Sequence, residues 1–280
     1  MNVELNHTRP ESIEGHIALF ARAFPGAAHF RADYLRWLYF ENPAGAVVGV
    51  DAQAEGRLAA TYVTIPARLK VDGQLTRGLL SLNTATDPDF QGKGLFTRLA
   101  NAVFERATAE GFSCVYGIAN ANSTPGFTRK LGFDLVEPLR AAIGLGHGYC
   151  ADLAAAHHEA RLAREWNPEE LAWRLRNPAN RVRAHAVAAD VTEFRAPTPY
   201  PLLEATAALP GTFAPARRAH LTPAVYLGTV PARVARRGAF VDIPSRLRPS
   251  PLNLIFRSLV GTSRIARGEA TISFLDFDAF

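Results

Sequence analysis

The sequence is poor in the residues that build disulfides and metal centres. Only two cysteines, Cys114 and Cys150, occur among the 280 residues, and neither stands in a short-spaced metal or redox motif. Cys114 lies in the apolar stretch SCVYGIA, so we predict a buried thiol with no base beside it. The eight histidines are scattered, except for the pair His157 and His158. We therefore expect neither a structural disulfide nor a metal cofactor.

Long apolar runs are also missing. No run approaches the ~20 residues that a helix needs to cross a bilayer. The opening residues MNVELNHTRPESIEG lack the apolar segment of a secretory signal. We expect a cytoplasmic protein with no membrane partner. With 48% hydrophobic residues, the chain can bury a core large enough for one large domain or two small ones.

Lysine is scarce, so arginine carries almost all of the positive charge. The net charge of +5 is unevenly distributed, because residues 1–160 carry a net charge of −2 and residues 161–280 carry one of +7. A basic nucleic-acid-binding protein is one alternative, but the arginines are dispersed and not interleaved with aromatic residues. We expect no nucleic-acid partner. The basic half would suit an anionic small molecule.

The order of predicted elements indicates an α/β protein. Apolar residues recur at helical spacing in several segments, and others are rich in β-formers. Asp72 and Gly73 carry the signal of a tight hairpin between two of these strands. The predicted elements are helices at 11–24 and 31–42, strands at 46–52, 57–71 and 75–86, a helix at 95–111, a strand at 112–120, a helix at 123–131 and a strand at 132–146.

A glycine-bracketed turn, QGKG at residues 91–94, precedes the helix at 95–111. Gly92 and Gly94 can aim successive backbone N–H groups at one point, and the helix adds its unpaired N-terminal donors and positive dipole end. This combination suits a phosphate-rich anion. The turn is not a Walker loop, because Gly-x-x-x-x-Gly-Lys-Ser/Thr is absent, and it lacks the three glycines of the dinucleotide fingerprint.

The stretch TATDPDFQGKGLFTRLA resembles the acyl-CoA pyrophosphate loop of the GCN5-related N-acetyltransferases (GNAT), whose pattern is Gln/Arg-x-x-Gly-x-Gly/Ala after a strand. Gln91 and Gly94 match this pattern, and Phe96 departs from it at the last small position. NANSTPGFTRKLGF, at 120–133, is similar to the family's later Asn-to-LGF segment. The two motifs stand in the family's order, and the resemblance covers about residues 10–146.

The resemblance implies the GNAT acyl-CoA N-acyltransferase fold, a mixed, mostly antiparallel sheet flanked by helices, with acetyl-CoA as co-substrate. It implies direct transfer of acetyl from the thioester to a primary amine of a small molecule. Loop amides would bind the pyrophosphate, and the preceding strand the pantetheine arm and the acetyl carbonyl. The implied cofactor-binding residues are Thr84, Ala85, Thr86, Gln91, Gly92, Lys93, Gly94, Leu95, Phe96, Asn120 and Asn122.

At the position of the catalytic acid, the sequence differs from the family pattern. The position at which members carry a tyrosine that protonates the leaving thiol falls on Thr128, whose hydroxyl is far too weakly acidic. Tyr116 is the nearest other candidate, and a thiolate also leaves readily without a dedicated acid. Asp87 and Glu41 could bind or deprotonate the amine, although Asp87 precedes a proline and suits the start of a turn. A catalytically weak acyl-CoA-binding or regulatory module is therefore a second alternative.

One segment of the second half is a degenerate repeat of a segment in the first half. DYLRWLYFENPAG recurs as EELAWRLRNPANR, with Trp37 and Trp173 each shortly before an Asn-Pro pair. PLNLIFRSLVG, at 251–261, resembles the start of the 95–111 helix without its glycines, and ATISFLDFDAF is compatible with a strand after it.

We predict a GNAT acyl-CoA-binding domain at 1–146 and a degenerate GNAT-like second half at 147–280, without an anion loop. The second copy would help to shape the acceptor pocket. This tandem arrangement resembles that of bacterial acetyltransferases of sugar and polysaccharide pathways. The acceptor implied is an amino sugar or a nucleotide-linked amino sugar.

Overall fold

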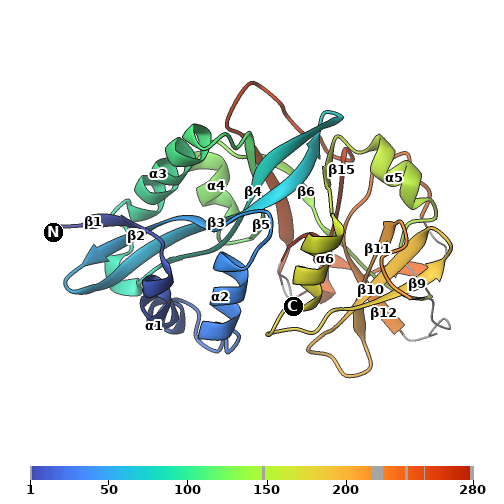
Figure 1. Cartoon of the computed structure of the whole chain (residues 1–280), viewed down its shortest axis with the longest axis horizontal. Helices are drawn as coiled ribbons and strands as arrows, with labels where there is room; N and C mark the ends of the chain where they lie inside the picture. Colours follow the sequence, from blue (N-terminus) through green and yellow to red (C-terminus); the bar gives the residue numbers. More distant parts are fainter. Residues whose placement is uncertain (1, 147–148, 216–222, 237–238, 249, 278–280) are drawn as a thin grey trace.

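The structure is a computed structural model that describes residues 2–146, 149–215, 223–236, 239–248 and 250–277 (Figure 1). Its helices are α1 (Ile13–Ala23), α2 (Ala32–Phe40), α3 (Leu95–Ala109), α4 (Thr124–Lys130), α5 (Leu153–Glu159) and α6 (Pro168–Leu175). Its strands are β1 (Glu4–His7), β2 (Val48–Ala54), β3 (Arg57–Val71), β4 (Gln74–Thr86), β5 (Cys114–Asn120), β6 (Asp134–Pro138), β7 (Arg140–Leu145), β8 (Leu162–Arg164), β9 (Arg183–Ala188), β10 (Val191–Pro197), β11 (Glu204–Pro210), β12 (Pro223–Thr229), β13 (Phe240–Asp242), β14 (Leu252–Ser258) and β15 (Ala270–Ser273). No described helix is both long enough and apolar enough to span a membrane.

The first half is a mixed sheet between two helical layers. The strands lie in the order β1-β2-β3-β4-β5-β14-β6, and only the β4–β5 pair is parallel. Helices α3 and α4 cover one face and α1 and α2 the other (Figure 1). The mixed, mostly antiparallel sheet flanked by helices confirms the expected fold class.

Among the described strands, the second half repeats this order from β2 onward. Strands β9, β10 and β11 form an antiparallel meander, β11 pairs in parallel with β12, and β7 and β13 continue the sheet in antiparallel pairs. Strands β8 and β15 join the two sheets through β3 and β12. Within residues 211–215, the described part of the β11–β12 connection, no helix stands in the place of α3.

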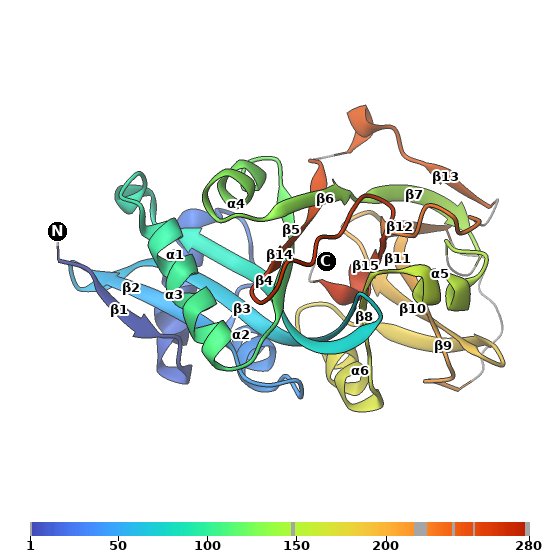
Figure 2. The same cartoon turned by 90° about the horizontal axis from the view of Figure 1, so that it is seen from above.

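Each half lends a strand to the other. Strand β7 follows β6 but leaves the first half and pairs with β12, as Figure 2 shows where β6 leads into β7. In return, β14 lies between β5 and β6. Leu254 and Phe256 of β14 pack into the core on the α1–α2 side, and Ile255 packs into the core under α3. The two halves are therefore interlocked.

A reciprocal tryptophan pair lies at the centre of the contact between halves. The Trp37 and Trp173 rings are stacked with centroids 4.7 Å apart. Each indole Nε1 donates a 3.1 Å hydrogen bond to the main-chain carbonyl oxygen of the other tryptophan. In the Asn-Pro turns that follow, Oδ1 of Asn42 and of Asn177 accepts from the backbone N–H two residues later. The two similar sequence segments thus form equivalent local structures, and these contact each other.

Most elements expected in the first half are confirmed, and two expectations were wrong. The single strand expected at 132–146 is two strands, because Pro138 has no N–H for the ladder and the chain passes to the other sheet at Leu139. The segment 251–261 is not a counterpart of the 95–111 helix but contains strand β14. Its apolar run is buried on both faces of a sheet, as in a central strand, and an amphipathic helix would bury only one side.

Candidate functional site

The glycine turn presents its backbone to open space. Gly92 and Gly94 both have φ of +73°, and a Cβ atom on either would meet no atom within 4 Å. Gly94 is the N-cap of α3, so the unpaired N–H groups of the first helical turn point past the loop. The Leu95 side chain is buried in the core, which leaves only its main chain to face a ligand. The Lys93 ammonium lies 4.6 Å from the centroid of the Phe90 ring.

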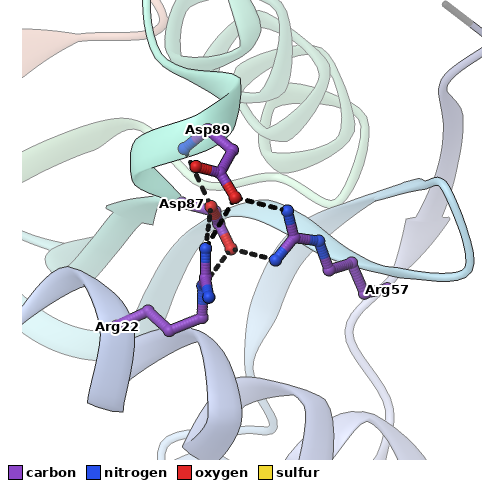
Figure 3. A network of polar contacts seen from close by, with 4 residues as sticks. All are labelled: Arg22, Arg57, Asp87 and Asp89. Carbon is purple, nitrogen blue, oxygen red and sulfur yellow. Dashed lines mark hydrogen bonds and ion pairs between the residues drawn. The ribbon is translucent and has the colours of Figure 1, made fainter.

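An ion-pair network holds the start of this loop in place (Figure 3). The buried Asp87 carboxylate accepts hydrogen bonds from Arg22 Nε at 2.7 Å and from the backbone N–H of Asp89 at 3.0 Å. Arg57 lies 3.3 Å from Asp87 and 2.7 Å from Asp89. The hydrogen bond from Arg22 lowers the pKa of Asp87 below its ordinary value. Asp87 therefore positions the loop as an ionised cap and is not placed as a base for an acceptor.

Strand β4 carries a bulge just before the loop. Asn83 and Thr84 together oppose the single residue Tyr62, and Asn83 has φ of +48°. Parallel pairing between β4 and β5 ends at Ser81 and Gly117, so the two strands diverge beyond this point. The Thr84 hydroxyl is buried there without a hydrogen-bond partner among the described residues. The bulge leaves polar groups available inside the gap between the strands.

A cavity of about 580 Å³ lies at this gap. It brings together seven of the residues that the sequence singled out, from β4, the loop, α3 and the end of β5. Ala23 and Phe24 at the end of α1, the N-cap residue Ser123 and two residues of α4 complete it. The other four predicted residues, Gly92, Lys93, Gly94 and Leu95, lie outside the lining. The described lining residues are Ala23, Phe24, Thr84, Ala85, Thr86, Gln91, Phe96, Asn120, Asn122, Ser123, Gly126 and Phe127, and none of them is ionisable near neutral pH.

The two asparagines have different roles. Asn120 Oδ1 accepts from the backbone N–H groups of Asn122 at 3.0 Å and Ser123 at 2.9 Å, so it caps the turn into α4. Ser123 occupies the N-cap position, but its side chain makes no capping hydrogen bond. Asn122 is exposed and lines the cavity. Asn120 therefore shapes the turn, and the Asn122 amide is the better placed to contact a ligand.

Phe96 fills the position at which the family pattern has a small residue. Its ring packs edge-on against Phe127 with centroids 5.4 Å apart. A Cβ atom on Gly126 would lie 3.2 Å from the Phe96 ring, tighter than ordinary van der Waals contact. The absent side chain at 126 thus makes room for the large side chain at 96. In the sequence, the glycine within a predicted helix was the only signal for this contact. Ser123 lies in the family-like segment at 120–133 but was not predicted as a site residue, and no sequence motif indicated Phe24.

Neither candidate for the catalytic acid borders this cavity. The Tyr116 side chain is fully buried on β5, and its hydroxyl donates a 2.7 Å hydrogen bond to the main-chain oxygen of Asp276. Burial raises the pKa of Tyr116 to about 12. The Thr128 hydroxyl donates to the main-chain oxygen of Thr124 at 3.0 Å. Glu41, a candidate base, is exposed and also stands outside the lining.

Two expectations from the sequence, a buried thiol at Cys114 and no metal cofactor, concern residues outside this cavity. Cys114 is buried and free, and burial raises the pKa of its thiol to about 11, so little thiolate exists at neutral pH. Among the described ranges, three or more His, Cys, Asp or Glu side chains never gather where they could hold a metal ion.

Comparison with known proteins places the first half in a family. Residues 4–136 match the model of an acetyltransferase (GNAT) domain. No curated protein matches the chain. Among solved structures, a GCN5-related N-acetyltransferase from Kribbella flavida is similar at a TM-score of 0.62 and 13% identity, over 92% of this chain and 71% of the other.

Two further structures show the same likeness. A GCN5-related N-acetyltransferase from Anabaena variabilis has a TM-score of 0.61 at 9% identity, over 92% of this chain and 73% of the other. Eis1 from Mycobacterium abscessus has a TM-score of 0.51 at 14% identity, over 75% of this chain and 59% of its own. At these identities the likeness shows the fold alone. Residues 4–136 are a GNAT acetyltransferase domain, and the chain continues into a further β-rich region.

Proposed function

We propose that the 580 Å³ cavity binds acetyl-CoA and that the chain transfers the acetyl group directly to a primary amine of a small molecule. The observation that carries the proposal is the meeting of three features in one cavity. These are the residues that flank the open glycine turn, Gln91 and Phe96, the bulge in β4 and the turn that begins α4. Gly92 and Gly94 lie between the two flanking residues, at the N-terminus of α3 and outside the lining itself. Each is a different kind of ligand-binding surface, and together they suit a long molecule with a phosphate end and a thioester end.

Different residues bind different parts of acetyl-CoA. The backbone N–H groups at Gly92, Gly94 and the first turn of α3 bind the pyrophosphate. The Asn122 amide and the divergent ends of β4 and β5 hold the pantetheine arm. At the bulge, the Thr84 hydroxyl and nearby main-chain groups donate hydrogen bonds to the thioester carbonyl oxygen, on which negative charge develops.

The reaction needs a free amine and a leaving thiolate. The amine nitrogen forms a bond to the carbonyl carbon, the C–S bond breaks, and its electron pair leaves on sulfur. The nitrogen then loses a proton to water. Because no described lining residue is ionisable near neutral pH, we propose that no dedicated acid protonates the thiolate. The rate should then rise with pH as the acceptor amine loses its proton.

We further propose that residues 1–146 form the acyl-CoA unit and that residues 147–280 are a degenerate copy of it, apart from the exchanged strands. The repeated strand order and the reciprocal Trp37–Trp173 contact support this division. The amino sugar or nucleotide-linked amino sugar that the sequence resemblance implies is one acceptor class to be tested.

The test uses the full chain. Acetyl-CoA binding is measured by calorimetry, and release of the CoA thiol is followed with a thiol reagent over a panel of primary amines. The N-acetylated form of each amine is the matched control for simple thioester hydrolysis. Binding with amine-dependent thiol release and a detected acetylated product supports the proposal.

Two outcomes contradict the proposal. Binding of acetyl-CoA without product over the whole panel identifies a catalytically weak acyl-CoA-binding module. No acetyl-CoA binding, together with nucleic-acid affinity that falls steeply with salt, identifies the basic nucleic-acid-binding alternative.

A further inference from the structure

A second cavity, of about 490 Å³, lies in the second half and is mainly aliphatic. Its floor is the face of the β7–β12 ladder that carries Ala141 and Leu227, which pair in register. Its walls are formed by the turn between β10 and β11 and, after β13, by Ile243, Leu247, Arg248 and Ser250. Leu139 and Leu252 close the end nearest the first half. Such a surface favours a hydrocarbon or aromatic group over a sugar ring, whose hydroxyls would lose hydrogen bonds to water there.

The charge of this cavity excludes an ammonium group. Arg248 is the one charged residue among the described residues that line it. Its guanidinium donates hydrogen bonds to the main-chain oxygens of Ile243 at 2.9 Å and Leu139 at 3.1 Å. No carboxylate belongs to the described lining, so a protonated amine would find a cation and no partner. An amine ligand is therefore expected to enter with its apolar part first.

The two cavities meet at one strand pair. Leu252, which lines the aliphatic cavity, is paired in register with Asn120, which lines the candidate acetyl-CoA cavity. The Asn253 amide next to it donates a 2.9 Å hydrogen bond to the Thr124 hydroxyl in the first turn of α4. The exchanged strand β14 thus brings the lining of the aliphatic cavity next to the end of β5, on the other side of which lies the gap to β4.

The rim of the aliphatic cavity exposes apolar side chains to water. Leu247 is 67% exposed and Tyr200 is 59% exposed, and both line the cavity. Covering such side chains with an apolar ligand is favourable, because it removes apolar surface from water. A ligand that fills the cavity would gain this contribution.

We infer that the aliphatic cavity binds the apolar body of the acceptor, so that the acceptor is a primary amine on a hydrocarbon or aromatic body. Its nitrogen lies toward Asn120 and the thioester. This inference rests on the proposed function and specifies its substrate class. It also gives the second half a role, which is to select the acceptor.

The first test compares butylamine, hexylamine and octylamine with glucosamine as acceptors at one pH. Each methylene buried in the cavity should raise kcat/KM about threefold to fourfold, the affinity equivalent of ~0.8 kcal/mol per methylene. Octylamine should exceed glucosamine by at least tenfold. A flat dependence on chain length, or a preference for glucosamine, would overturn the inference in favour of a polar acceptor.

The second test uses two variants and a matched control. Ala141→Leu places a larger side chain in the cavity, and Leu247→Ser replaces an apolar side chain at the rim of the cavity by a polar one. Both should raise the KM for octylamine, by about tenfold for Ala141→Leu, with little change for butylamine and none in the acetyl-CoA Kd. Leu75→Ser changes an equally exposed leucine, 61% exposed on β4 and outside the lining, and should change none of these values. An unchanged octylamine KM in both cavity variants contradicts the inference.

Calorimetry with octylamine alone separates this inference from the proposed function. If no amine is acetylated but octylamine binds and Ala141→Leu weakens that binding, the cavity assignment stands and the transferase proposal fails. If glucosamine is acetylated and octylamine neither binds nor reacts, the transferase proposal stands and the cavity assignment fails.

Discussion

Replacement of Gly94 by aspartate tests the proposed pyrophosphate site with little damage to the fold. Gly94 is exposed, and a Cβ atom there would meet nothing within 4 Å. The cost to folding is therefore the backbone conformation alone, φ of +73°. An L-residue in this left-handed region costs roughly 1–2 kcal/mol, and Asp and Asn tolerate it better than most. A native protein of this size is expected to survive such a cost.

The effect on ligand binding should be larger. A new carboxylate would stand about where the pyrophosphate lies, and two unit charges ~4 Å apart repel by about 1 kcal/mol in water. The loop is open to solvent, so this aqueous value applies to each of the two phosphate charges. The sum of about 2 kcal/mol corresponds to a loss of about thirtyfold in affinity. We expect the acetyl-CoA Kd to rise at least tenfold.

Calorimetry on three variants separates the contributions. Gly94→Asn has the same shape without the charge, so the difference between Asn and Asp measures the repulsion. Gly73→Asp makes the same change at φ of +79° in the β3–β4 hairpin, where again nothing lies within 4 Å, and it should leave acetyl-CoA binding unchanged. If folded Gly94→Asp binds acetyl-CoA as tightly as the parent chain, the loop does not hold the pyrophosphate.

Three other changes test the structure around the site. Trp37→Phe removes the indole donor to the Trp173 carbonyl, which keeps only the bond from the Arg176 N–H, and it shrinks the stacked ring; the free energy of unfolding should fall by ~1–3 kcal/mol in urea denaturation, and no change would mean that the reciprocal contact is weak. Tyr116→Phe should leave turnover nearly unchanged, since the hydroxyl is bonded within the core; a hundredfold loss with intact acetyl-CoA binding would make it the acid. Because Arg22 lowers the pKa of Asp87, that carboxylate stabilises the fold above its unfolded pKa of about 3.9 and loses the effect as pH falls. Between about pH 6 and pH 3 the parent should therefore lose more stability than Asp87→Asn, and equal losses would count against the ion pair.

Local patterns explain why much of the first half could be predicted. The helices around Leu19 and Leu99 bury one face each, and the hairpin at Asp72 and Gly73 has the positive φ values its sequence requires. Gln91, Phe96 and Asn122 reach one cavity because each lies close to the end of a strand or the start of a helix. In such cases the chemistry of a few consecutive residues decides the structure.

Non-local contacts explain what the sequence did not reveal. Alternation along β5 shows that Tyr116 and Val115 face opposite sides, but not that the chain near Asp276 covers the tyrosine hydroxyl. In the same way, Phe24 reaches the cavity only because α1 packs against β3 and β4. The aliphatic cavity is assembled from strands and turns distributed between residues 139 and 252, so no continuous motif represents it.

The exchange of β7 and β14 sets an order of events during synthesis. When residues 1–146 have left the ribosome, β5 can pair with β4 but has no partner on its other side, because β14 is made more than a hundred residues later. Until then an apolar strand edge is open to wrong partners, and chaperones that bind such edges are expected to engage the nascent chain there. The proposed acyl-CoA site beside β5 can therefore mature only after β14 has been translated.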